Sequence, residues 1–189
     1  MHGEQPSSQR QSLGDGFNFL YLLVSCHSTC LLTFLRHSFG HEALGINGLG
    51  AFVMLCLWVA GNPQSLGIAI FCCLWFISLI CQRIQTFRIA RQGVVIHSHY
   101  GGYPWFGFLL PFIKTYQVAV VIEIALCLLG ATCFIGLDEA LSGFLFFGAL
   151  SIAIKNFIEG ATLKKQLRRM RDAELEQKYL LELYRKGNF

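Results

Sequence analysis

VAVVIEIALCLLGATCFIGLDEALSGFLFFGALSIAIKNFI, from Val118 to Ile158, is the stretch that decides the fold class. Apart from Glu123 and Lys155, its charges are confined to the adjacent Asp138 and Glu139, which divide it into two apolar segments. A helix crosses a bilayer with roughly 20 mostly apolar residues, and its backbone satisfies its own hydrogen bonds inside lipid. We therefore predict two membrane-spanning helices, 118–137 and 140–158, joined by a tight turn at Asp138–Glu139.

Three further apolar segments precede this pair, at about 17–35, 43–61 and 66–81. The last two are separated by Asn-Pro-Gln-Ser, a short polar connector that predicts a second helical hairpin. The first is diluted by Asn, Ser, Thr and His side chains, so crossing the membrane and lying in its plane both stay open. The predicted fold is an all-α polytopic membrane protein with four or five transmembrane helices, arranged in two helical hairpins.

The composition supports a membrane class. Apolar residues make up 54% of the chain and charged residues 14%, where a soluble protein has about 25% charged. Half of the charges lie after Ile158. We expect a polar tail over 1–16, a transmembrane domain over 17–158 with a cytoplasmic or interfacial loop at 82–117, and a charged helical tail over 159–189.

The positions of Lys and Arg predict the orientation. A five-span threading puts three segments with Lys or Arg on one side of the membrane: Arg36, the loop after 66–81 and the tail. The two tight turns on the other side carry no Lys or Arg. Positive residues favour the cytoplasmic side, so we expect a cytoplasmic C-terminus in a cell membrane or inner membrane. The same residues follow apolar segments and form no basic face, so no nucleic-acid partner is expected.

The loop contains an aromatic-rich stretch, VVIHSHYGGYPWFGFLLPF, from Val94 to Phe112. Amphipathic aromatics favour the headgroup level of a bilayer, and the apolar run here is too short to cross one. We predict an interfacial segment in this loop, anchored by four aromatic side chains: Tyr100, Tyr103, Trp105 and Phe108.

Four histidines suggest an alternative, metal-binding reading of the same loops. His97 and His99 would point the same way on a strand, and His37 and His41 are helically spaced in the preceding loop. Together they would offer the three or more ligands that a metal site needs. A metal-dependent membrane enzyme using these residues is therefore kept as one alternative function.

Two charges lie within the predicted spans, Glu123 in 118–137 and Lys155 near the cytoplasmic end of 140–158. An intramembrane carboxylate is costly, and it marks either an ion pair or a transport pathway. Folding the hairpin about Asp138–Glu139 brings Glu123 to the level of Lys155, one helix away. We predict a Glu123–Lys155 pair, and keep a small transporter or channel component using Glu123 as the second alternative.

The tail predicts a cytoplasmic helix with a basic cluster near the last span. Lys or Arg near a membrane surface attracts anionic headgroups, and an exposed helix can also dock on another protein. The residues expected to make these lipid or partner contacts are Lys164, Lys165, Arg168, Arg169 and Arg171.

The sequence contains no P-loop, nucleophile elbow or zinc-protease motif. Its eight cysteines form no CxxC pair and lie in or at the ends of apolar segments, where thiols pack as small hydrophobes. We therefore expect no cofactor and no catalysis. The predicted function is a structural or assembly subunit of a larger membrane complex, with other membrane proteins and the bilayer as partners.

Overall fold

The computed structural model describes residues 7–37, 39, 45–91, 102–105 and 115–186. It divides the chain into two units, 1–155 and 156–189, which are described separately below. The described elements are helices apart from two short strands. They are α1 (Ser7–Leu35), β1 (Arg36–His37), α2 (Ile46–Gly61), α3 (Leu66–Arg91), β2 (Tyr103–Pro104), α5 (Tyr116–Phe134) and α6 (Glu139–Arg185).

Four helices are long and apolar enough to cross a membrane: α1 from Gly16, α3, α5 and α6. α2 is apolar but shorter, because it begins at Ile46 and not at the predicted residue 43. Its 16 residues rise about 24 Å, less than the ~30 Å of a bilayer core. Both predicted connectors are present, at 62–65 between α2 and α3 and at 135–138 between α5 and α6.

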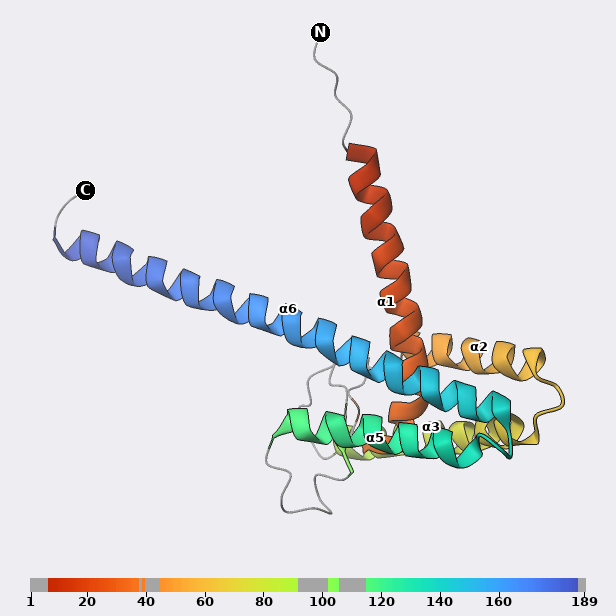
Figure 1. The fold of residues 1–189 in the computed structure, drawn as a ribbon. Coiled ribbons are helices and arrows are strands. Elements are labelled where there is room, and N and C mark those ends of the chain that lie inside the picture. Colours follow the sequence, from red (N-terminus) through yellow and green to blue (C-terminus); the bar gives the residue numbers. More distant parts are fainter. Residues whose placement is uncertain (1–6, 38, 40–44, 92–101, 106–114, 187–189) are drawn as a thin grey trace, which may run out of the picture. The chain divides into compact units, whose positions relative to one another are not determined.

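The second half of α1 lies in the core of the first unit. Nine consecutive residues, Ser25 to Thr33, are buried, so neighbours cover this part of the helix on every side. In Figure 1, α1 runs across the direction that α2, α3 and α5 share. The first unit is therefore not a bundle of parallel helices.

Two glycines permit the close approach of α1 to its neighbours. A Cβ on Gly148 of α6 would overlap the side chain of Leu31, and one on Gly50 of α2 would overlap the sulfur of Cys26. Gly143 differs, since a Cβ there would meet no atom within 4 Å. Small residues thus set the helix spacing at Gly50 and Gly148, whereas Gly143 borders open space.

β1 and β2 form a two-stranded antiparallel sheet in which Arg36 lies opposite Pro104 and His37 opposite Tyr103. Gly102, just before β2, has a φ of +82°, a conformation that favours glycine. Its Cα approaches the carbonyl oxygen of His37 so closely that an added Cβ would lie 3.0 Å from it. The sheet therefore fixes the chain directly after α1.

Asp138, in the connector between α5 and α6, joins the two helical hairpins. Its carboxylate accepts hydrogen bonds from the Ser65 hydroxyl at 2.6 and 2.7 Å, from the Gly67 N–H at 2.8 Å and from the Leu141 N–H at 3.0 Å. The Gly67 and Leu141 amides belong to the first turns of α3 and α6. One carboxylate thus caps two helices, where a negative charge is also favourable.

The hydrogen bonds from Ser65 and then from Leu141 hold the pKa of Asp138 below its usual range. A carboxyl group whose pKa is depressed by folding stabilises the folded state above its unfolded pKa, about 3.9. That contribution is lost as the pH falls through the lower, folded value.

We expect Asp138→Asn to lower the melting temperature in detergent at pH 7, because the charged acceptor shared by two helix N-termini is lost. The cost should be about 1 kcal/mol, the usual value of one helix cap. The wild type should lose this difference below about pH 4. Thermal unfolding from pH 3 to pH 7 measures both. Glu139→Gln, at the adjacent carboxylate, is the control, and equal shifts in the two variants would contradict the capping role.

Candidate functional site

Glu123 lies in the second turn of α5 and is completely buried. Its neighbours on the buried face of the helix are Ala119, Val120 and Cys127. Such surroundings do not replace the hydration of a carboxylate, so an ionised Glu123 requires a counter-charge with hydrogen bonds.

Arg36 of β1 provides that counter-charge. Its Nε donates to Oε1 of Glu123 at 2.7 Å and its Nη2 to Oε2 at 2.6 Å. These two parallel bonds are the fork geometry in which guanidinium and carboxylate interact most strongly. Nη1 also donates to the Tyr116 hydroxyl at 3.1 Å, and the guanidinium carbon lies 5.6 Å from the centre of that ring.

The prediction that Glu123 pairs with Lys155 is therefore wrong, because the structure pairs Glu123 with Arg36. The buried carboxylate is paired, but with a residue 87 positions earlier in the chain. Arg36 was expected in an exposed loop, and it is 3% exposed. It therefore does not belong to the solvent-facing charges that set membrane orientation.

The end of α1 is held by side chains of α3. The last carbonyls of a helix lack partners within the helix. The Thr33 carbonyl accepts from the Ser78 hydroxyl at 3.0 Å and from the Gln82 amide at 3.3 Å, and Gln82 also donates to the Arg36 carbonyl at 2.7 Å. The backbone N–H of Trp105 donates to the Leu35 carbonyl at 3.0 Å. Arg36 is thus fixed through its backbone as well as its side chain.

A second polar contact lies in the interior, between α1 and α6. Nδ1 of His27 lies 3.0 Å from the Ser151 hydroxyl, and the imidazole packs on the Phe144 ring with the ring centres 4.6 Å apart. Among the described residues, Nε2 of His27 has no hydrogen-bond partner. His27 therefore joins α1 to α6 through a polar contact.

The predicted metal ligands are described only in part. His37 packs against Trp105, with the ring centres 5.2 Å apart. His41, His97 and His99 lie outside the described residues, as do the predicted anchors Tyr100 and Phe108. Of Tyr103 only the backbone is described, and Trp105 is exposed. Among the described residues, no three His, Cys, Asp or Glu side chains are grouped to hold a metal ion.

The second unit, residues 156–189, holds the remaining candidates on the later part of α6. All five basic residues of the predicted contact cluster are exposed: Lys164, Lys165, Arg168, Arg169 and Arg171. Lys178 donates to Glu174 at 2.7 Å across one helical turn.

No protein-family model matches the chain, and neither a curated protein nor a solved structure does.

The Arg36–Glu123 pair is suited to fastening helices. Both carboxylate oxygens are occupied and the charge is neutralised, so an incoming cation or proton would have to displace the guanidinium. The pair links the end of α1 to α5, and the Gln82 amide extends the network to α3.

We expect Arg36→Met and Glu123→Gln each to lower stability strongly, by about 3–5 kcal/mol, because each leaves a buried charge without its partner. The double variant should recover part of the loss. Detergent melting temperatures of the four proteins form the test, with Arg88→Met on the exposed side of α3 as the control for loss of an arginine.

A Lys155→Met change should not rescue Glu123→Gln, because both carboxylate oxygens of Glu123 are bound by Arg36. Strictly additive losses for Arg36 and Glu123, or rescue by Lys155→Met, would contradict the assignment.

Proposed function

We propose that this chain is a multi-pass integral membrane protein that acts without catalysis, as a structural or assembly subunit of a larger membrane complex. The observation that carries the proposal is that the first unit buries polar and charged side chains within its core while large apolar side chains cover its exterior.

The buried set contains charged, amide and hydroxyl side chains, including Ser28, Thr33, Arg36, Gln82 and Glu123. In soluble proteins such residues are mostly exposed. Large apolar side chains instead point outward from every helix of the unit, as in Phe19, Leu57, Ile77, Leu129 and Phe147. An exterior of this kind needs an apolar surrounding, and the helix lengths suit a bilayer.

A static role is favoured over transport by the state of Glu123. An intramembrane acid that carries ions or protons needs access to water or a chain of exchangeable groups. Glu123 is completely buried and is held at both oxygens by Arg36. This arrangement supports a fastening role for the charge.

A subunit role is supported by the second unit. Its helix carries exposed apolar side chains, which include Leu163, Leu167, Met170, Leu181 and Tyr184. Leu163, Leu167 and Met170 are separated by four and three residues and lie on one face of the helix. Leu181 and Tyr184, three residues apart, resume that face 11 residues after Met170, and Glu174 and Gln177 occupy it in between. An isolated helix is marginal in water, so we propose that this face docks on a partner protein while the basic cluster contacts anionic headgroups.

The proposed threading puts the C-terminus in the cytoplasm. Without Arg36, the Lys and Arg still concentrate in the last part of α3, which contains Arg83, Arg88 and Arg91, and along the tail, whereas the 62–65 and 135–138 connectors have none. α1 runs across the direction that α2, α3 and α5 share (Figure 1), so we propose four crossings rather than five, by α2, α3, α5 and α6, in which the short α2 is accommodated by local thinning of the bilayer. Both threadings put residues 92 and 188 on one side and residue 64 on the other.

Single-cysteine labelling in a cysteine-free background tests the threading. We expect a membrane-impermeant maleimide to label Gln64→Cys from outside, and Gln92→Cys and Asn188→Cys only after permeabilisation. Ser8→Cys should behave like Asn188→Cys if α1 does not cross. Labelling of Gln92→Cys from outside would overturn the orientation, and extraction of the chain by alkaline carbonate would overturn membrane insertion itself.

Variants of the tail test the subunit role. The double variant Leu167→Ser, Met170→Ser should lower the affinity for a stoichiometric protein partner at least tenfold. Each of the two apolar side chains contributes about 1.5–3 kcal/mol when it is buried at an interface. Co-purification in mild detergent, quantified by mass spectrometry, measures this. Arg168→Ser with Arg169→Ser is the matched control and should instead reduce binding to anionic vesicles. A partner set unchanged by removal of residues 160–189 would contradict the docking role.

A further inference from the structure

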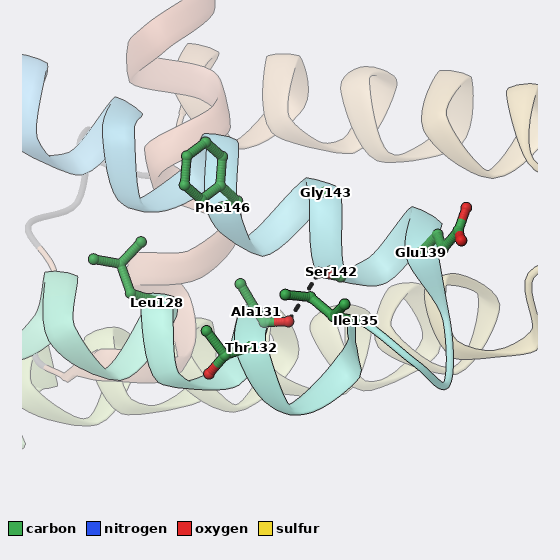
Figure 2. A pocket seen from close by; sticks show the side chains of 8 residues that line it. All are labelled: Leu128, Ala131, Thr132, Ile135, Glu139, Ser142, Gly143 and Phe146. Atoms are coloured by element: carbon green, nitrogen blue, oxygen red, sulfur yellow. Dashed lines mark hydrogen bonds between the residues drawn. The ribbon is translucent and has the colours of Figure 1, made fainter.

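A groove of about 620 Å³ lies between α5 and α6 in the first unit (Figure 2). Leu128, Ala131, Thr132 and Ile135 line it from the α5 side, and Glu139, Ser142, Gly143 and Phe146 from α6. Its volume falls within the roughly 300–1,000 Å³ that accommodates one small molecule. Leu128, Ile135 and Phe146 are exposed, so the groove opens on the outside of the helices.

The floor of the groove presents almost no polar atom to a ligand. The Ser142 hydroxyl donates to the Ala131 carbonyl at 2.8 Å, and the Thr132 hydroxyl donates to the Leu129 carbonyl at 2.8 Å. With these hydroxyls engaged by backbone, the wall chemistry is that of Leu, Ile, Phe and small residues. An aliphatic chain suits such a surface.

One end of the groove differs, because Glu139 is the charged residue among those that line it. In the described part of the chain, no hydrogen bond or ion pair engages its carboxylate, whereas the adjacent Asp138 is occupied by the caps of α3 and α6. Lys and Arg are absent from the sequence between Thr115 and Ile154. The potential at this end is therefore negative, and it favours a cationic group.

Glu139 is the first residue of α6, at the polar turn, and Phe146 lies seven residues further along. That separation corresponds to about 10 Å. A ligand with a positive head and an aliphatic tail would put its head beside Glu139 and its tail between Leu128 and Phe146. This is the arrangement of a membrane lipid in one leaflet, with the headgroup at the boundary.

We propose that the α5–α6 groove binds a phospholipid whose headgroup carries an ammonium group, with the ammonium on Glu139 and an acyl chain in the groove. The inference rests on the proposed membrane insertion and adds a specific lipid site to it. A helix from a partner or a second copy is the competing occupant, but a single carboxylate at one end of an otherwise apolar groove favours a ligand with one cationic head and an aliphatic tail.

Gly143 makes the site testable without disturbing the fold. A Cβ added there would meet no atom within 4 Å, and Gly143 lines the groove, so we expect the side chain of Gly143→Leu to extend into the groove. Gly160→Leu is the matched control, since it lies on the same helix, is equally unobstructed and is remote from the groove in sequence. Glu139→Gln removes the charge and keeps the shape.

The experiment is native mass spectrometry of the full chain from nanodiscs that contain equal amounts of phosphatidylethanolamine and phosphatidylglycerol with identical acyl chains. The wild type and Gly160→Leu should retain one phosphatidylethanolamine per chain in preference to phosphatidylglycerol. Gly143→Leu should lose the bound lipid. Glu139→Gln should keep a lipid while its headgroup preference falls about two- to fivefold, the effect of one exposed ion pair.

Two results would overturn the lipid site. In one, wild type and Gly143→Leu would retain the same amounts of phosphatidylethanolamine and phosphatidylglycerol, which would show that the groove contacts bulk lipid without selecting one. A change of oligomeric state in Gly143→Leu with lipid retention unaffected would assign the groove to a protein helix. Extraction of the wild type by alkaline carbonate is a separate failure, because it removes membrane insertion and not the site alone. Melting temperatures equal to wild type establish that the variants are folded.

Discussion

The burial of Glu123 is the constraint on which the first unit depends. A carboxylate with no exposed surface needs a cation in a fixed geometry, and Arg36 meets that need with two short bonds. To reach Glu123, the chain after α1 must be fixed beside α5. The β1–β2 sheet and the Gln82 amide fix it there. Replacing such a pair by apolar residues is often neutral in energy, so its contribution is to select one arrangement of helices.

The polar contacts that join the described helices of this unit include three with ionisable side chains. Asp138 caps two helices at one end, His27 meets Ser151 between α1 and α6, and Arg36 meets Glu123 near the start of α5. Apolar packing between helices does little to distinguish one arrangement from another when the surroundings are also apolar. Directional contacts at three places do distinguish them, because each is satisfied in one relative position of the helices.

The elements were predictable from the sequence to the extent that their signals are local. The apolar runs around Asp138–Glu139 and around Asn62–Ser65 locate four helices and both connectors, because helix length and turn composition are read over a few residues. The partner of Glu123 was not predictable in this way. Lys155 is its neighbour across one hairpin, whereas Arg36 reaches it only through the path of α1, which no local pattern encodes. An arginine directly after a helix rich in Ser and Thr was the available signal, and it was read as a loop charge.

The 87-residue separation between Arg36 and Glu123 has a consequence for biosynthesis. At about 5–20 residues per second, roughly 4–17 s pass between synthesis of the arginine and synthesis of its partner. During that interval the carboxylate of Glu123 does not yet exist, so the guanidinium of Arg36 cannot take the buried position that the pair gives it. In the proposed membrane-inserted chain, the end of α1 would therefore stay where water or headgroups reach it until α5 emerges, and the helix made first would be among the last to reach its final place.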